Sequence, residues 1–408
     1  MNSPKIRFKG YTEDWEQRKL GDITVKIGSG KTPLGGKSAY VETGIPLIRS
    51  QNVNGDKVDF ADIVYIDEAT DELMANSRVY TNDVLLNITG ASIGRSAVYK
   101  GLESANVNQH VCIIRPTEGH QPDFIQLNLS SDNGQKQIDA SQAGGGREGL
   151  NFQEIGKMQF SFPSLNEQMT IGRYFNSLDH LITLHQRKLE QTKTLKKYML
   201  QKMFPQEGQK VPEIRFEGFT GDWEQRKLSE IALQTYGGGT PKTTNEEFWK
   251  GNIPWIQSSD LIEERLFNVK PRKYISQEAI SKSATKLVPQ NSIAIVTRVG
   301  VGKLAFMPFS YATSQDFLSL SELKIEPEFA VYALYKMMQL VSNEVQGTSI
   351  KGITKDELLA KEFLIPGGEE QKKIGVYLHN LDHLITLHQR EYEKLQELKK
   401  FMLQNMFV

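Results

Sequence analysis

Three residue patterns in the sequence have the chemical types that catalysis uses, and each is incomplete. Gly30-Lys31-Thr32 resembles the end of a phosphate-binding loop, but Val25 stands where that loop needs a further glycine. Glu322-Leu323-Lys324 has the Glu-x-Lys order seen in nucleases, but no Pro-Asp pair precedes it at a suitable spacing. His180 and His185 are five residues apart on a predicted helix, so they face different directions and do not form a metal pair.

Two further absences narrow the chemistry. The sequence contains no Pro-Pro pair, which excludes the Asn/Asp-Pro-Pro-aromatic motif of adenine methyltransferases. Cys112 is the only cysteine, so the chain has neither an internal disulfide nor a cysteine zinc site, and its apolar neighbours predict a buried thiol. We therefore expect no catalytic residue, no metal site and no cofactor bound by this chain.

The composition is that of a globular protein of two or three domains. Of 408 residues, 38% are apolar and 24% charged, and 49 basic residues balance 49 acidic ones. Contacts to nucleic acid would thus have to come from local patches. Met1–Gly10 is polar and basic, unlike a secretory signal, and no apolar run approaches ~18 residues. The sequence predicts a cytoplasmic protein without a membrane span.

An internal repeat organises the chain. Pro4–Ile23 recurs as Pro212–Ile231, with Trp15–Leu20 repeated letter for letter, and Leu178–Arg187 recurs as Leu381–Arg390. Each half has an opening segment, a diverged body and a closing helix, which indicates a duplicated domain.

The diverged bodies are predicted to be mixed α/β. Short runs rich in β-branched residues predict buried strands at Val84–Ile88, Val111–Ile114 and Ser292–Thr297. Apolar periodicity predicts amphipathic helices at Pro122–Ala140 and Glu326–Val345.

The closing segments carry a heptad pattern that predicts two long helices pairing as an antiparallel coiled coil. The a and d positions of the first are Leu178, Leu181, His185, Lys188, Thr192, Leu195 and Met199. Those of the second are Leu381, Leu384, His388, Glu391, Leu395, Leu398 and Met402.

These features together resemble the specificity subunit of type I restriction-modification systems. The resemblance rests on the duplicated halves, the repeated Trp-Glu-x-x-Lys-Leu segments, and the junctions Pro163…Glu167-Gln168 and Pro366…Glu370-Gln371 before each helix. It covers essentially the whole chain. It implies an α+β fold in which two mixed α/β target-recognition domains are separated by two long antiparallel helices and related by a pseudo-two-fold repeat.

The expected domains follow from the repeat and the resemblance. Residues 1–165 and 207–366 are the target-recognition domains, and residues 166–206 and 367–408 are the spacer helices. The resemblance implies that each half reads one half of a bipartite double-stranded DNA site. It also implies two modification (methyltransferase) subunits, docked on the helices, and restriction subunits. S-adenosylmethionine, ATP and Mg would be bound by those partners.

Residue chemistry then nominates the contacts. Arg pairs with guanine and Asn or Gln with adenine, and Lys favours phosphates. The candidate DNA-binding residues of the first half are Lys31, Thr32, Arg49, Gln51, Asn52, Arg95 and Arg147. Those of the second half are Thr240, Lys242, Gln257, Ser258, Arg298, Lys303 and Lys351. The candidate coiled-coil and docking residues are Leu178, Leu181, Leu195, Met199, Leu381, Leu384, Leu395, Leu398 and Met402.

Two other interpretations stay open at the level of sequence. A stand-alone restriction-methyltransferase is disfavoured by the missing motifs and by the lack of chain length for a catalytic domain. A non-catalytic protein–protein adaptor with two diverged binding modules fits the zero net charge equally well. Salt-sensitive binding to duplex DNA separates the adaptor from a DNA reader.

Overall fold

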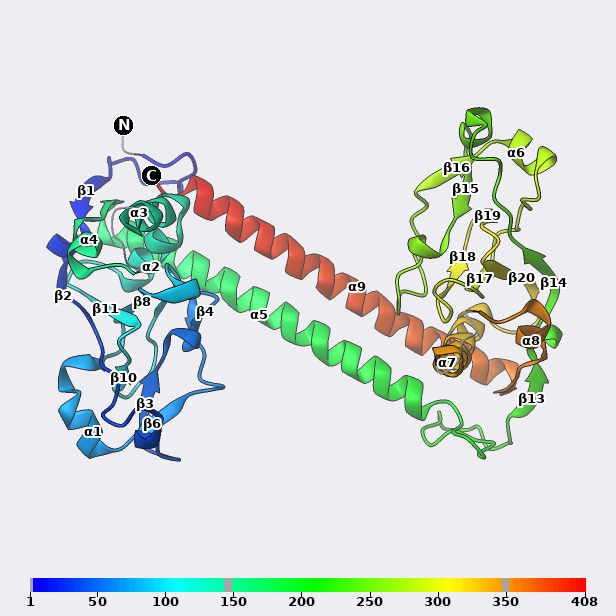
Figure 1. Ribbon diagram of the computed structural model, residues 1–408, viewed down its shortest axis with the longest axis horizontal. Coiled ribbons are helices and arrows are strands. Elements are labelled where there is room, and N and C mark those ends of the chain that lie inside the picture. The colour runs from blue at the N-terminus through cyan, green and yellow to red at the C-terminus, as the bar shows by residue number, and fades with distance from the viewer. Residues whose placement is uncertain (1–2, 143–148, 347–351) are drawn as a thin grey trace. The chain divides into compact units, whose positions relative to one another are not determined.

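The structure is a computed structural model that describes residues 3–142, 149–346 and 352–408. The chain forms two compact units (Figure 1). Unit 1 comprises residues 1–185 and 390–408, and unit 2 comprises residues 186–389. Two helices contribute to both units: α5 (Leu165–Lys202) and α9 (Gly368–Asn405).

The described residues of unit 1 form two four-stranded sheets, besides smaller two-stranded pairings. One has the strand order β6-β3-β10-β7 and the other β2-β11-β8-β9. The members of the first are β3 (Ile45–Ile48), β6 (Val64–Ile66), β7 (Arg78–Val79) and β10 (Ala105–Val107). The members of the second are β2 (Thr24–Ser29), β8 (Val84–Asn87), β9 (Ser96–Val98) and β11 (Val111–Pro116). Two-residue strands β4 (Val53–Asn54) and β5 (Lys57–Val58) form a hairpin.

Helices cover these sheets at opposite ends of the unit (Figure 1). They are α1 (Glu68–Leu73), α2 (Pro122–Ser130), α3 (Asp132–Gln142) and α4 (Phe152–Lys157). The predicted helix over 122–140 is interrupted at Ser131. The backbone of Ser131 is extended, its O–H group donates to the Asn128 carbonyl (2.7 Å), and its oxygen accepts from the Gly134 backbone N–H (3.1 Å). Ser131 therefore ends α2 and caps α3.

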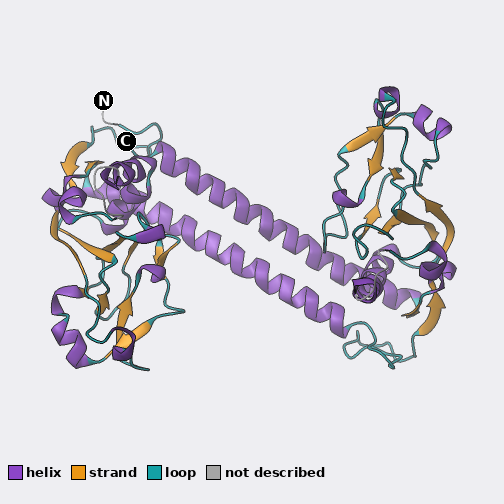
Figure 2. Cartoon of the chain, in the orientation of Figure 1, coloured by secondary structure: helices purple, strands orange, loops and turns teal. Residues whose placement is uncertain are grey.

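Unit 2 repeats this plan with fewer strands (Figure 2). Its sheets have the orders β14-β20-β17-β18 and β16-β15-β19. The strands are β14 (Ala232–Gly237), β15 (Ile253–Ile256), β16 (Lys273–Ile275), β17 (Ser292–Val296), β18 (Leu304–Met307), β19 (Ala312–Thr313) and β20 (Phe317–Leu323). The helices are α6 (Gln277–Lys282), α7 (Pro327–Gln346) and α8 (Lys355–Ala360). The predicted buried strands are confirmed as β8, β11 and β17, and Cys112 is fully buried, which raises the pKa of its thiol to about 12.

The repeated sequence blocks build the joint between each body and its long helix. The opening segment forms β1 (Glu16–Lys19) in unit 1 and β13 (Glu224–Lys227) in unit 2. These strands pair antiparallel with β12 (Gln159–Phe162) and β21 (Glu362–Ile365), which lie directly before α5 and α9. Trp15 and Trp223 are buried behind them against Phe124 and Phe329.

A buried glutamate–glutamine pair completes each joint. In unit 1, Arg7 donates two hydrogen bonds of 2.7 Å to Glu167. The Gln168 amide donates to the Pro163 carbonyl (2.9 Å) and its oxygen accepts from the Gln121 backbone (3.0 Å). Gln168 thereby links the start of α5 to the residue before α2.

Unit 2 makes the same bonds with its own copies of these residues. Arg215 donates to Glu370 at 2.7 and 2.8 Å, and Gln371 joins the Pro366 carbonyl (2.7 Å) to the Glu326 backbone (3.0 Å). Buried charges of this kind are retained only when paired and hydrogen-bonded. This requirement accounts for the repeated Pro…Glu-Gln junction.

The helix pairs are antiparallel, and their seam differs from the expected one. In unit 1, the ring centroids of Phe175 and Phe407 are 6.1 Å apart, and Asp179 forms an ion pair with Lys399. Residue numbers therefore increase along one helix as they decrease along the other. Along α5, buried or half-buried residues recur at spacings of four and three, at Leu178, Ile182, His185, Leu189, Thr192, Lys196 and Met199. The equivalent positions of α9 are Leu381, Ile385, His388, Tyr392, Leu395, Lys399 and Met402.

Every second position of the predicted heptad is therefore wrong by one residue. Leu181, Lys188, Leu195, Leu384 and Leu398 are exposed rather than in the seam, and Glu391 also lies outside it. The seam residues follow one another at spacings of four and then three, starting from Leu178 or Leu381. The predicted heptad starts from the same residues but uses spacings of three and then four. Leucines occupy both sets of positions, so the sequence pattern does not distinguish them. The seam instead takes in Lys196 and Lys399.

Each seam lysine is neutralised by an aspartate of the other helix. In unit 2 the Lys196 ammonium lies 2.5 Å from Asp382, whose other oxygen accepts from the Tyr332 hydroxyl at 2.5 Å. In unit 1 Lys399 lies 2.5 Å from Asp179 and 2.8 Å from Asp56 on the β4–β5 hairpin. Burial alone would lower the pKa of Lys399, but the two carboxylates outweigh it and raise the pKa, so the lysine stays charged.

Removing the charge of Lys196 should destabilise unit 2. The Lys196→Met variant leaves Asp382 without its ion partner, and we expect the free energy of unfolding in urea to fall by about 3 kcal/mol. The matched control is Lys193→Met, whose exposed pair with Glu190 should be worth less than about 1 kcal/mol. The double variant Lys196→Met/Asp382→Leu should recover most of the loss. Equal losses for Lys196→Met and Lys193→Met would contradict this role of the buried pair.

Candidate DNA interface

One edge of each unit gathers loops from both sheets. In unit 1, β3 and β10 are parallel, so their carboxyl ends meet. Ser29 and Asn87, the last residues of β2 and β8, pair with the first residues of β11, which follows directly after the turn that leaves β10. We call these loops (residues 30–32, 49–52, 88–95 and 108–110) the loop edge of unit 1.

Unit 2 builds the same edge from equivalent loops. β15 and β19 are parallel, and the Ser314 amide donates to the Ile256 carbonyl (3.0 Å), as the Asn108 amide donates to Ile48 (3.1 Å) in unit 1. The loop edge of unit 2 comprises residues 238–242, 257–260, 297–303 and 314–316.

Close backbone approach requires glycine at the start of each edge. A Cβ on Gly30 would lie 1.6 Å from the Val107 carbonyl oxygen, and one on Gly238 would lie 1.8 Å from that of Ser314. These glycines bring Lys31 and Thr32, or Thr240, beside the turn that follows β10 or β19. Close backbone packing thus explains why both halves have a glycine at the start of the shared Gly-x-x-Pro segment.

In unit 1, hydrogen bonds join the loops that carry the nominated residues. The buried Asn87 amide donates to the Ser50 carbonyl (2.8 Å), and the exposed Arg95 donates to Asn54 (3.3 Å). Thr89 bonds His110 at 2.5 Å, which connects the loop after β8 to the turn after β10.

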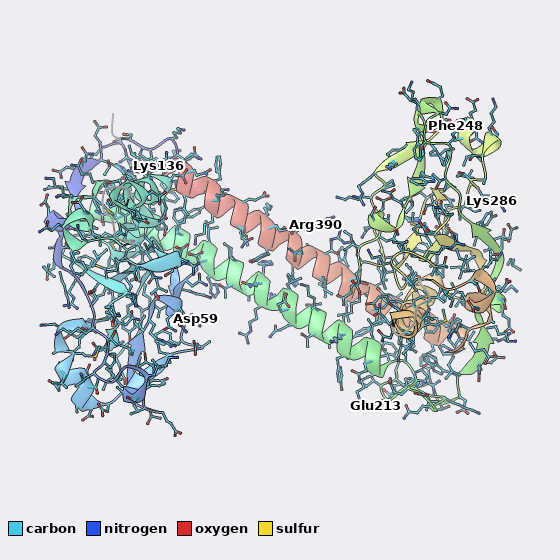
Figure 3. All side chains as sticks on the ribbon, in the orientation of Figure 1. Asp59, Lys136, Glu213, Phe248, Lys286 and Arg390 are labelled. Carbon is cyan, nitrogen blue, oxygen red and sulfur yellow. The ribbon has the colours of Figure 1, made fainter. Side chains whose placement is uncertain are left out.

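The segment after β3 is anchored by Asp62, a residue that sequence reasoning missed. Arg49 donates to the Asp62 backbone oxygen (2.6 Å) and carboxylate (3.2 Å), and the Gln51 amide donates to the same carboxylate. Asp59, labelled in Figure 3, lies on the same loop. Gln51 stays exposed, whereas the Arg49 side chain is only 18% exposed.

Asn52 has a structural role in this conformation. It is buried, its oxygen accepts from the Arg49 amide (3.0 Å), and its nitrogen donates to the carbonyls of Asp59 (3.0 Å) and Asp62 (3.2 Å). This capping box closes the single turn Ser50–Asn52. Asn52 therefore holds the loop rather than presenting an amide at its surface.

In unit 2, Asp260 replaces Asn52 as the cap. Its carboxylate accepts from the Gln257 amide (2.9 Å) and from Arg272 (2.5 Å). Thr240 donates to the exposed Gln315 at 2.6 Å. Lys242 and Arg298 are exposed, and Gln257, Ser258 and Lys303 are half-buried.

The remaining nominated residues and a second missed set complete the edge. Arg147 and Lys351 lie outside the described residues, but Gly149 pairs with Thr89, and Gly352 packs against Thr297. The turns after β10 and β19 were missed, although aligning Asn108-Gln109-His110 with Ser314-Gln315-Asp316 would have found an exposed glutamine at the same place in both. The sequence gives no comparable indication of Asp62 and Arg272, because the residues that they bond are ten or more positions away along the chain.

Two units that present equivalent loop edges on one scaffold define a protein with a pair of related recognition domains. The sequence model of the type I restriction modification DNA specificity domain matches residues 12–194 and 220–397. The chain therefore belongs to this family and carries its domain twice.

Relatives agree with that assignment. The chain is 24% identical to the putative type I restriction enzyme MjaX specificity subunit of Methanocaldococcus jannaschii, over 98% of this chain and 94% of that protein. It is 30% identical to the EcoR124I/EcoR124II specificity subunit of Escherichia coli, over 44% of this chain and 48% of that protein. The crystal structure of a type I restriction-modification S subunit from M. genitalium has the same fold, with a TM-score of 0.64, 12% identity, and coverage of 100% of this chain and 99% of that one.

The close approach at Gly30 should not tolerate a side chain. Gly30→Ala forces the Val107 backbone to move, and we expect a loss of about 2 kcal/mol in the unfolding free energy of unit 1. Gly28→Ala is the matched control, because a Cβ there meets no atom within 4 Å, and it should change stability by less than about 0.5 kcal/mol. Equal stability of the two variants, measured by urea denaturation, would argue against the packing described here.

Proposed function

We propose that this chain is the DNA specificity subunit of a type I restriction-modification complex, and that each unit reads one half of a split DNA site. The observation that carries the proposal is the loop edge, built twice from equivalent strands but with different polar residues. Two edges with one backbone plan and different hydrogen-bonding groups suit two half-sites of different sequence.

Among the nominated residues, side-chain chemistry and position on the loop edge suggest two groups of contacts. Gln51, Gln257 and Ser258 occupy the segments after β3 and β15 and are the proposed base readers, with Gln109 and Gln315 added beside them. Lys31, Lys242, Arg95, Arg298 and Lys303 flank these segments and are proposed to bind phosphates. Asn52 and Arg49 support the first loop from within.

The partner subunits are proposed to dock on the outer faces of α5 and α9. Leu195 and Tyr198 of α5 directly precede seam residues, as do Leu384 and Leu387 of α9. In an antiparallel pair, positions with the same offset from the seam lie on the same flank, so these four side chains form one apolar patch in unit 2. A shallow depression beside Leu195 and Tyr198 is lined by Arg187, Glu190, Gln191 and Thr194.

Unit 1 carries the same patch, from Leu181 and Leu184 of α5 and Leu398 and Phe401 of α9. A patch repeated in both units suits two copies of one partner, and we assign it to two modification subunits, which restriction subunits then join. S-adenosylmethionine, ATP and Mg would be bound by those subunits, in the cytoplasm where the DNA lies. In the part of the chain that the structure describes, no helix is long and apolar enough to cross a membrane.

Methylation of DNA in cells tests the function directly. In cells that express this chain with its modification subunit, single-molecule sequencing should show adenine methylation on both strands of one split motif with an unspecified gap. The methylation should disappear when this chain is omitted. An active modification subunit whose methylation does not depend on this chain would contradict the proposal and favour an adaptor role.

Placing a charge in the unit 2 patch should remove one partner copy. For Leu195→Glu/Leu384→Glu, we expect native mass spectrometry to show one modification subunit per chain in place of two, because the apolar contact is lost. Lys193→Glu, an exposed change on the same helix, should retain both copies. Unchanged assembly in the leucine double variant would place the docking surface elsewhere.

A further inference from the structure

The two loop edges differ in polarity at one equivalent place. In unit 1, Arg49, Gln51 and Asn52 all donate to Asp62, whose exposed carboxylate faces solvent on its other side. In unit 2 the loop after β15 itself carries the acidic residue, Asp260. Its partner is the basic residue Arg272, which directly precedes β16. The first edge thus exposes an acceptor where the second exposes a donor.

Arg272 is anchored at one side and open at the other. Its Nε lies 2.5 Å from Asp260 Oδ1, and its Nη2 donates to the Ser259 carbonyl oxygen. The Asp260 carboxylate is 0% exposed, while the Arg272 side chain is 58% exposed. A buried carboxylate therefore holds the guanidinium from behind and leaves its remaining N–H groups toward solvent.

Strand register places this guanidinium on the loop edge. Lys273, the next residue, pairs with Trp255 in β15, so Arg272 lies where β15 ends and Gln257 begins. The ammonium of the neighbouring Lys273 lies 5.7 Å from the ring centroids of Trp249 and Trp255. Alternate residues of a strand point to opposite faces, so Arg272 points away from the side of Lys273 that faces the tryptophans. Its bonds to Asp260 and to the Ser259 carbonyl place it beside the loop that carries Gln257 and Ser258.

We propose that Arg272 is a specificity-determining residue of the second domain and that it reads a guanine. An arginine presents two parallel N–H donors, which match the O6 and N7 acceptors of guanine in the major groove. Anchoring by Asp260 fixes the side-chain rotamer before DNA binds, so less conformational entropy is lost on recognition. Asp260 acts as the positioning residue.

This inference rests on the proposed function, and the first domain provides its contrast. Asp62 and the Gln51 oxygen are acceptors, so they suit a base that donates an amino hydrogen, adenine or cytosine. The two half-sites are therefore expected to differ at the positions that these residues read.

Methylation profiling of Arg272 variants in the assembled complex tests the proposal. Arg272→Ala should lower the preference for guanine at one position of one half-site by about tenfold, while the other half-site stays unchanged. Arg272→Lys keeps the positive charge but not the paired donors, and it should lose the same preference. Arg226→Ala is the matched control, because this exposed arginine pairs with Glu224 on β13, away from the loop edge.

Three results would overturn the inference. Retained preference in Arg272→Lys together with a uniform fall across all sequences in Arg272→Ala would identify a phosphate contact. Wild-type behaviour of Arg272→Ala would remove any role in recognition. A split motif without guanine in either half would sink the inference and leave the proposed function in place, whereas absence of any chain-dependent motif would sink both.

Discussion

A buried carboxylate at the start of each long helix constrains much of this architecture. Glu167 and Glu370 are almost fully buried, and each forms an ion pair with the arginine of its opening segment, Arg7 or Arg215. The glutamine that follows ties the same point to α2 or α7. Opening segment, helix and body are thus locked at one position in each unit, and the loops at the far end of the sheets are free to change. The duplicated blocks therefore coincide with the joints, and the diverged sequence with the loop edges.

Within that frame, the two domains achieve different surfaces by exchanging donors and acceptors. Asn52 caps its loop with both an oxygen and a nitrogen and leaves an acid, Asp62, at the surface. Asp260 caps the equivalent loop with oxygens alone and draws Arg272 toward it. One change of cap from amide to carboxylate thus goes with an inverted charge at the edge, without any change in strand register.

Much of the fold could be predicted from sequence, because the duplication marks the joints and the closing helices have strong periodicity. The mixed α/β bodies with two long paired helices are confirmed. The seam was misplaced since Leu181, Leu195, Leu384 and Leu398 looked more suitable for burial than Lys196 and Lys399. Only the pairing of those lysines with Asp382 and Asp179, distant in sequence, makes them acceptable in the seam. The same limit applies at the loop edge, where the sequence favours Asn52 as a base reader but the fold directs its amide to the carbonyls of Asp59 and Asp62.

The division of the chain between units also separates the two parts of unit 1 in time during synthesis. Unit 2 is continuous in sequence, whereas unit 1 needs residues 390–408, including Met406 and Phe407, to close its core around Phe124 and Phe175. At ribosomal speeds of about 5–20 residues per second, the first 185 residues wait roughly 10–40 s for that segment. During this interval Phe124 and Phe175 lack the contact with Phe407 that they make in the folded unit. The core of the first domain is therefore completed by the last residues of the chain to be added.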